Sequence, residues 1–292
     1  MKEWLIEMKM TRRTFLKSFF WAVAGGFLMS SGLYNYARYI EPRRLEVKKK
    51  AFFHPKLSQA LDGLKLVQFS DTHLNDHFQI EHLKKVVNKV NEFEPDLIVF
   101  TGDLIDEPNR YPYFEQIPPV LKRLRASLGK FAVYGNHDHG GYGTDLYEEI
   151  LLQADFHLLK NERKEIELLD GSRIVLAGLD DYILGKPDFR KIFRESDKND
   201  FTILLVHEPD AVLQAKEYHF DLQLSGHSHG GQVKIPFYGA VYTPPYAKRF
   251  TEGFYKIGQT SLYVNRGLGT TRLPFRFLSV PEITLFTLHA NK

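Results

Sequence analysis

The sequence predicts an α/β domain, and two observations support this prediction. Short apolar runs rich in Val, Ile, Leu and Phe, typical of buried strands, alternate with segments whose apolar residues recur at helical spacing. With 43% hydrophobic and 26% charged residues, the 292-residue chain also has the composition of a globular protein with a sizeable core. We find no internal repeat, so one domain of about 230 residues is the simplest organisation.

The expected elements follow one another along the body of the chain. The runs expected to form central strands are 64–70, 97–101, 131–134, 174–178, 202–206 and 222–225. Apolar residues at helical spacing predict one helix from Ile80 to Val90 and another from Tyr147 to Ala154. Residues 165–177 predict a β-hairpin that turns at Asp170-Gly171, and 261–265 and 282–288 predict further strands.

Residues 1–37 have the layout of an export leader. Arg12-Arg13, followed by Phe15-Leu16-Lys17, precedes a stretch without charge from residue 18 to 36. The adjacent arginines resemble the twin-arginine type of signal, which implies export of the folded chain by the twin-arginine machinery. No typical cleavage site follows, and the stretch is at the lower limit for a spanning helix, so a retained anchor and a released protein both stay open.

Residues 38–58 are expected to form a basic linker. Of 39 Lys+Arg and 36 Asp+Glu, residues 1–50 hold 11 and 4, which leaves 28 and 32 for residues 51–292. The positive charge is therefore a property of the N-terminal segment, and the body shows no footprint for nucleic acid. A solvated spacer is the simplest expectation for the linker; the alternative is attraction to an anionic cell wall or membrane surface.

The polar residues that stand out come directly after the predicted strands, where open α/β sheets bind ligands. They lie in five blocks: Asp71-Thr-His73, Gly102-Asp103, Gly135-Asn136-His137-Asp138, His207, and Gly226-His227-Ser-His229. Each block alone is weak evidence, but so many carboxylates and imidazoles at one sheet edge would repel or desolvate one another without cations. The chain has no cysteine, and this donor set suits Mn²⁺, Fe, Zn²⁺ or Co²⁺ better than Ca²⁺. The number of donors indicates two ions that share a carboxylate, an arrangement suited to displacement at phosphorus.

In this order and spacing, the five blocks resemble the calcineurin-like metallophosphoesterases over about residues 60–290. With the leader included, the sequence looks closest to the exported YkuE/YaeI-like phosphodiesterase branch found in bacteria. The resemblance implies a β-sandwich flanked by helices, in α/β/β/α layers, over residues 59–292, with the active site at the carboxyl ends of the strands. It implies one metal on Asp71, His73 and His229, a second on Asn136, His207 and His227, and Asp103 between them.

The same resemblance implies a function, the hydrolysis of phosphate esters and most of all phosphodiesters, by a hydroxide held between two divalent ions (Mn, Zn or Fe). His137 would stabilise the transferring phosphoryl group or protonate the leaving oxygen, and Asp138 would orient it. His139 and Arg266 are further candidates for contacting the phosphate-ester substrate.

Two other functions stay open from the sequence. One is a pyrophosphatase that acts on a lipid-linked nucleotide sugar, and the other is a metal-binding protein of the cell envelope without turnover. The aromatic, proline-containing stretch 236–255 is expected to be a packed loop or hairpin that covers the sheet, with a substrate-selecting wall as the alternative. Asp180-Asp181 would either support the site or cap the next segment.

Overall fold

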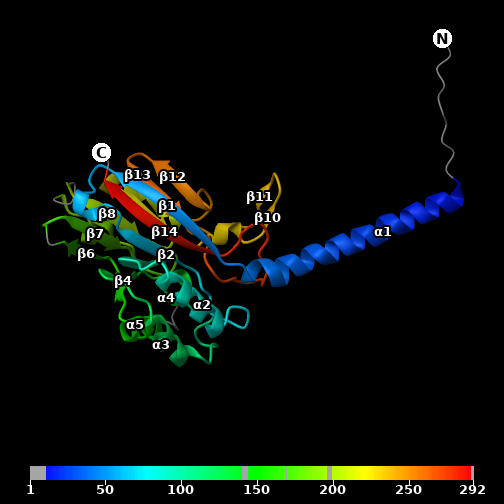
Figure 1. Ribbon diagram of the computed structural model, residues 1–292, viewed down its shortest axis with the longest axis horizontal. Coiled ribbons are helices and arrows are strands. Elements are labelled where there is room, and N and C mark those ends of the chain that lie inside the picture. Colours follow the sequence, from blue (N-terminus) through cyan, green and yellow to red (C-terminus); the bar gives the residue numbers. More distant parts are fainter. Residues whose placement is uncertain (1–10, 140–143, 169, 196–198, 291–292) are drawn as a thin grey trace, which may run out of the picture.

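Two six-stranded sheets lie at the centre of the described part of the chain (Figure 1). The computed structural model describes residues 11–139, 144–168, 170–195 and 199–290, so residues 1–10 of the expected leader and Leu169 of the expected hairpin lie outside it. The first sheet has the order β1 (Glu46–His54), β14 (Glu282–Ala290), β2 (Lys65–Phe69), β3 (Leu97–Phe100), β4 (Gly129–Ala132) and β5 (His157–Leu158). The second has the order β12 (Gly253–Ile257), β13 (Thr260–Val264), β9 (Leu222–Ser225), β8 (Phe201–Leu205), β7 (Arg173–Gly178) and β6 (Glu162–Glu167).

Helices cover the outer face of each sheet, which confirms the expected α/β/β/α layers. On the first sheet α2 (Ile80–Asn91), α3 (Ile117–Leu121) and α5 (Thr144–Gln153) bury their apolar residues, among them Leu83 and Ile150. On the second sheet α6 (Phe189–Ile192) and α7 (Val212–Ala215) pack against Leu204 and Val206. A short helix, α4 (Asn136–His139), and a small hairpin of β10 (Lys234–Ile235) and β11 (Gly239–Ala240) lie outside these layers.

The core between the sheets consists of the apolar runs that the sequence singles out. Leu66, Val99 and Phe131 of the first sheet face Leu176 and Ile203 of the second, and none of the five is more than 2% exposed. Strands buried on both faces read as continuous apolar runs, which is why the six central strands could be predicted. The expected hairpin is also present, since β6 and β7 pair antiparallel. The third predicted run is displaced by two residues, because its pairing with β3 begins at Gly129.

The expected linker forms part of the first sheet, which corrects the expectation of a solvated spacer over residues 38–58. Residues 46–54 form β1, which pairs along its whole length with β14 in parallel. Phe52 is only 7% exposed and enters the core between the sheets, where its ring lies 5.9 Å from that of Phe201. Lys48, Lys49 and Lys50 lie on this edge strand, and charged side chains on an edge discourage pairing with other chains.

The N-terminal helix α1 (Arg12–Asn35) projects away from the sheets (Figure 1). Thr11 caps it by accepting a hydrogen bond from the backbone N–H of Thr14, and none of its described residues is buried. Its end passes into a π-helical turn at Tyr36–Ile40, where the carbonyl of Ala37 accepts a hydrogen bond from the N–H of Arg276. Among the described residues, no helix has the length and apolar character required to cross a membrane.

Candidate metal centre

The five blocks meet at the carboxyl ends of β2, β3, β4, β8 and β9. Sharp turns of the backbone bring them together, because Asp71, His73, Asp103, His227 and His229 all have positive φ, between 40° and 67°. Residues with side chains rarely adopt this conformation, and it concentrates where a site must be preorganised. Gly226 shows how closely the loops approach, since a Cβ there would overlap Ser70 and Asp71.

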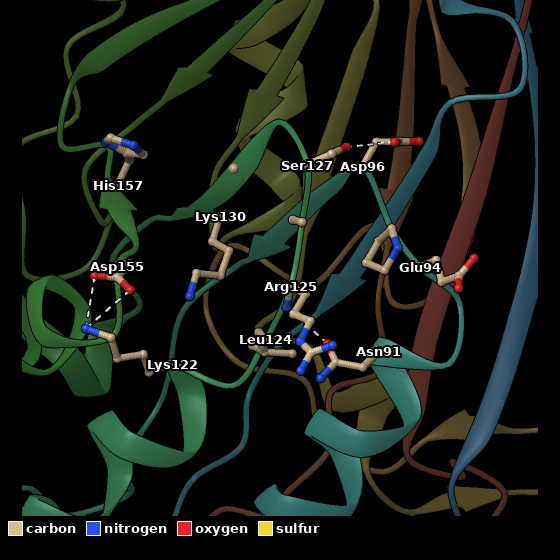
Figure 2. Close-up of a pocket in the computed structure, with 13 residues that line it drawn as sticks. Asn91, Glu94, Asp96, Lys122, Leu124, Arg125, Ser127, Lys130, Asp155 and His157 are labelled. Atoms are coloured by element: carbon tan, nitrogen blue, oxygen red, sulfur yellow. Dashed lines mark hydrogen bonds and ion pairs between the residues drawn. The ribbon is translucent and has the colours of Figure 1, made fainter.

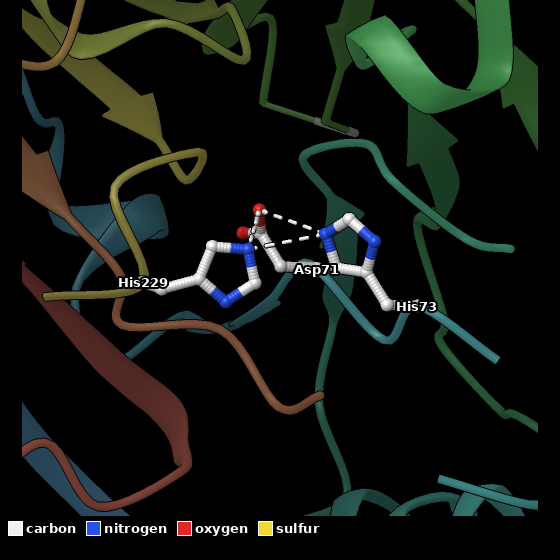
Figure 3. Close-up of side chains that lie close together, drawn as sticks. All are labelled: Asp71, His73 and His229. Atoms are coloured by element: carbon white, nitrogen blue, oxygen red, sulfur yellow. Dashed lines mark hydrogen bonds and ion pairs between the residues drawn. The ribbon is translucent and has the colours of Figure 1, made fainter. Parts of the chain in front are cut away.

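Asp71, His73 and His229 form the first cluster (Figure 3). The Nε2 atoms of His73 and His229 are 3.1 Å apart, and the Oδ1 atom of Asp71 lies 3.4 Å from His229 Nε2 and 3.9 Å from His73 Nε2. All three side chains are buried. Two imidazole nitrogens and a carboxylate oxygen that converge in this way are ligands for a divalent ion.

Asp103, His207 and His227 form the second cluster. The Oδ2 atom of Asp103 lies 3.2 Å from His207 Nε2 and 3.3 Å from His73 Nε2, so this carboxylate stands between the two clusters. The Oδ1 atom of Asn136 is buried and finds no hydrogen-bond partner among the described residues, and the buried Nε2 atom of His207 makes no hydrogen bond of regular geometry although Asp103 Oδ2 is close. Buried polar atoms of this kind are costly, and a metal ion in the second cluster would satisfy both. The residues therefore fit two metal ions.

The pKa values of the histidines also indicate that the centre is suited to bind positive charge. Burial lowers the pKa of His73, but Asp103 and Asp106 outweigh it and raise the pKa to about 10. Burial acts in the same way on His207, and Asp103 and Asp71 raise its pKa well above the usual value. Burial lowers the pKa of His227 to about 3, and His207 lowers it further. Without metal, protons on the imidazoles of His73 and His207 thus balance the negative charges of the carboxylates.

The imidazoles are held by their second nitrogens. His207 Nδ1 donates to the carbonyl of Thr101 over 2.6 Å, and His227 Nε2 donates to the carbonyl of Pro245 over 2.9 Å. These bonds leave the opposite ring nitrogen of each residue toward the centre. Such partners fix the tautomer and the orientation of metal-binding histidines.

Asp106 is a residue of the site that the sequence reasoning missed. Its Oδ1 atom lies 3.1 Å from His73 Nδ1, and its carbonyl accepts a hydrogen bond of 2.7 Å from His137 Nδ1. Asp106 follows Asp103 in the same loop after β3. A second carboxylate so soon after Asp103, in the segment that follows a predicted strand, could have indicated that Asp106 belongs to the site.

Asp138 bonds to the backbone of two loops of the site. Its carboxylate accepts hydrogen bonds from the backbone N–H groups of Asp103, Leu104 and Gly135, at 2.6, 2.9 and 2.9 Å, and its expected part in orienting His137 stays a prediction. Burial, followed by Asp103, raises the pKa of Asp138 to about 7 although these three bonds lower it. Asp138 therefore ties the loop after β3 to the loop after β4.

The two expected substrate contacts are engaged elsewhere. His139 Nε2 lies 2.8 Å from Asp180 Oδ1, which accepts a hydrogen bond from the N–H of Asp181 as well. Arg266 is 9% exposed, and its guanidinium pairs with Glu46 and, at 2.7 Å, with Glu282 Oε2. Neither residue lines the cavity at the metal clusters, and their contact with substrate stays a prediction.

A cavity of about 500 Å³ opens over the clusters. Asp103, Asn136, His137, His227 and His229 reach it, and its walls include Ile183, Val241, Tyr242, Pro244, Pro245, Arg272 and Leu273. The aromatic stretch is thus only partly packed as expected. Phe250 is buried, whereas Tyr242 lines the cavity and Phe237 and Tyr238 are exposed, because the β10–β11 hairpin projects beyond the sheets.

Asp180 and Asp181 support one wall of the cavity. Asp181 Oδ2 accepts hydrogen bonds from the backbone N–H groups of Ile183, Leu184 and Gly185, and Asp180 Oδ2 accepts one from Lys186. These bonds fix the turn that carries Ile183 into the cavity wall.

Another hollow of about 780 Å³ lies at the opposite, amino ends of β3, β4 and β5 (Figure 2). Two of its cationic side chains have partners: Lys122 Nζ is 3.5 Å from Asp155 Oδ2, and Lys130 Nζ donates to the carbonyl of Ala154 over 2.6 Å. It has no cluster of metal-binding residues among those described. The chemistry is therefore placed at the carboxyl ends.

Residues 64–231 match the family model described as calcineurin-like phosphoesterase. The chain belongs to this family. The metallophosphoesterase is therefore a hydrolase of phosphate esters, and its cofactor is a pair of divalent metal ions. The fold and the resemblance expected from the sequence are confirmed; the assignment of individual residues as ligands stays a prediction that the geometry fits.

Two relatives show how the metallophosphoesterase compares with known proteins. It is 51% identical to an uncharacterized metallophosphoesterase, YkuE, of Bacillus subtilis, over 97% of this chain and 99% of that one. It is 30% identical to the UDP-2,3-diacylglucosamine pyrophosphatase LpxG of Chlamydia trachomatis, over 86% and 91%. Among solved structures, the NAD nucleotidase NadN of Haemophilus influenzae is similar with a TM-score of 0.46 and 14% identity, over 70% of this chain and 45% of that one.

Proposed function

We propose that this metallophosphoesterase is an exported phosphodiesterase. The observation that carries the substrate class is the lining of the cavity: apolar side chains come from four separate segments, at Ile183, at Val233, at 241–245 and at Leu273. Arg272 is the single Lys or Arg among the described residues of that lining. A phosphodiester has two substituents to be bound and one negative charge, whereas a monoester approaches two negative charges at neutral pH. Apolar walls with little positive charge beyond the metals favour the diester.

The residues of the centre would divide the reaction between them. Asp71, His73, Asp103, Asn136, His207, His227 and His229 would hold the two ions. When bound, the ions supply a hydroxide nucleophile at neutral pH and polarise the phosphoryl group. His137 is 29% exposed at its side chain and reaches the cavity, and the bond from its Nδ1 atom to Asp106 leaves Nε2 to protonate the leaving oxygen.

The test is metal content and hydrolysis of bis(p-nitrophenyl) phosphate and p-nitrophenyl phosphate by the full chain. The proposal expects faster turnover of the diester. His137→Ala should keep its metal and lose about 10²–10⁴-fold in kcat, and Asp103→Asn should lose metal. Glu81→Gln, on the exposed surface of α2, is the control. Faster turnover of the monoester, or full activity of His137→Ala, would contradict the proposal.

A second candidate is hydrolysis of the pyrophosphate bond in a lipid-linked nucleotide sugar. It is favoured by the 30% identity to LpxG over most of both chains, together with the apolar walls of the cavity. Release of UMP from a UDP-linked acylated sugar, with little turnover of the chromogenic diester, would favour this candidate over the first. Metal binding without turnover of any of the three compounds would favour a non-catalytic metal-binding protein.

For export, we propose that Arg12-Arg13 directs the folded chain to the twin-arginine machinery and that the protein works outside the cytoplasm, at the cell wall or the outer face of the membrane. Both arginines lie exposed at the start of α1, and no charged residue follows Lys17 in that helix. Replacing both with Lys should retain the protein in the cytoplasm. Equal export of the wild type and this variant would refute the assignment.

A further inference from the structure

The β10–β11 hairpin carries aromatic side chains into solvent. Between its strands lies the turn 236–238, in which Phe237 is fully exposed and Tyr238 is 77% exposed. Ile235 on β10 and Val241 just after β11 are more than half exposed. Such a group of exposed apolar side chains marks an interaction surface rather than a packed element.

This hairpin is continuous with the end of α1. Val233, at its base, pairs with Phe277, and the N–H of Lys234 donates to the carbonyl of Phe277 over 2.9 Å. The ring of Phe277 lies 6.2 Å from that of Tyr36, and the ring of Phe275 lies 5.4 Å from that of Tyr34. The hairpin, the loop 273–278 and the end of α1 therefore lie together at one end of the layered body (Figure 1).

The exposed side chains of α1 indicate what kind of partner this end of the body binds. Its apolar side chains are exposed around the whole helix, including the neighbours Phe19, Phe20 and Trp21 at 59, 64 and 71%. A protein groove binds one face of a helix, whereas the interfacial region of a bilayer can accept apolar side chains from most of a helix that lies in it.

The cations beside this end add charge complementarity. Arg43 and Arg44 are exposed at the end of the short helical turns that follow α1. The guanidinium of Arg272 lies 4.9 Å from the ring centre of Tyr242. Arginines next to exposed aromatics suit an anionic lipid surface.

We propose that Ile235, Phe237, Tyr238, Val241, Leu273 and Leu278 form a docking surface that inserts into the interface of a bilayer containing anionic lipid. The docking surface adjoins the cavity, since Val241 and Leu273 belong to both. Docking therefore turns the mouth of the cavity toward the lipid surface. The proposal concerns binding and orientation, and it holds whether the substrate is a diester or a pyrophosphate.

The absence of cysteine from the chain permits a direct test. Phe237→Cys in the full chain would carry an environment-sensitive fluorophore, and Leu152→Cys, 76% exposed on α5, would be the matched control. With vesicles of phosphatidylcholine and phosphatidylglycerol in equal parts, emission at position 237 should rise several-fold and shift to the blue, while position 152 should not respond. If the protein floats with the vesicles but the probe at 237 stays in water, α1 alone binds and the docking surface is refuted.

A second variant separates the hairpin from α1. Phe237→Ser with Tyr238→Ser should weaken vesicle binding by about tenfold or more, because burial of even one of the two aromatic rings in the bilayer interface would be lost. Leu152→Ser should bind as the wild type does. Equal binding by all three, or a probe at 237 that is already shielded without lipid because two copies associate, would overturn the proposal. None of these readouts depends on hydrolysis, so a failed phosphodiesterase assay leaves the test intact.

Discussion

Asp106 positions two imidazoles of the centre through one short loop. Its carboxylate is 3.1 Å from His73 Nδ1, and its carbonyl accepts from His137 Nδ1. Asp106→Asn should keep the fold and lower kcat about 10–100-fold, the usual effect of losing an outer partner of a metal-binding histidine. The readout is kcat on the diester together with metal content.

Glu81 is the control, because its carboxylate is exposed on α2 and remote from the centre. Glu81→Gln removes an exposed charge on α2 and should leave kcat unchanged. Wild-type kcat and metal content in Asp106→Asn would show that His73 and His137 are positioned without the carboxylate.

Metal binding should depend on pH through His73. Its pKa, raised to about 10 by Asp103 and Asp106 against burial, means that the metal-free protein holds this proton at neutral pH. The proton contributes stability below the unfolded pKa of about 6.5, and this contribution is lost as pH rises through about 10. A metal must displace the proton, so its affinity should rise between about pH 6 and pH 9. Calorimetry in buffers of different ionisation enthalpy should detect protons released on metal binding; zero release would contradict the charges inferred here.

Asp138 joins the loops that follow β3 and β4. An amide at this position cannot accept all three backbone N–H groups, so Asp138→Asn should leave a buried donor without a partner and cost about 1–3 kcal/mol. We expect a lower free energy of unfolding and weaker metal binding, since Asp103 and Asn136 lie on the two joined loops. Asp155→Asn, an exposed substitution, is the control in chemical denaturation. Loss of activity with unchanged stability and metal content would instead support direct action on His137.

Strand β1 offers a matched pair of substitutions on opposite faces. Phe52 is 7% exposed between the sheets, and its neighbour Phe53 is 61% exposed. Phe52→Ala should cost about 3–5 kcal/mol, the usual effect of emptying a buried aromatic position, whereas Phe53→Ala should cost far less. Urea unfolding of the two variants measures the difference. Equal, small losses would mean that β1 contributes little to the fold and that the linker interpretation was correct after all.

The contrast between β1 and the central strands shows what local sequence can predict. Leu97–Phe100 is buried on both faces, so its apolar run identifies it without its neighbours. Strand β1 is an edge strand rich in lysine, and its partner β14 lies at the other end of the chain, so no local pattern indicated the pairing. At the site, the order of the blocks indicated the candidate ligands. The partners of Arg266 and the bonds of Asp138 depend on segments that only the folded chain brings together.

The layered body and α1 differ in how much they contribute to the buried core. The body has its own core in and around the sheets, and β1 belongs to it, whereas no described residue of α1 is buried. A chain that starts at Tyr36 keeps β1 and the contact of Ala37 with Arg276. It should therefore unfold within about 2–4 °C of the full chain, which corresponds to about 1 kcal/mol for a domain of this size, and should hydrolyse a soluble diester at the same rate.

A chain that starts at Pro55 should be compared with the chain from Tyr36, because it lacks β1 as well as α1. That chain should lose the cooperative transition or unfold at a much lower temperature, since β14 would lose a nine-residue partner strand and Phe52 would leave the core. Differential scanning calorimetry of the three proteins places the start of the folded unit between residues 36 and 54 if only the chain from Pro55 is destabilised. If the chain from Tyr36 is destabilised as strongly as the chain from Pro55, the ring contacts of Tyr34 with Phe275 are part of the fold, and α1 serves the body as well as the surface that it meets.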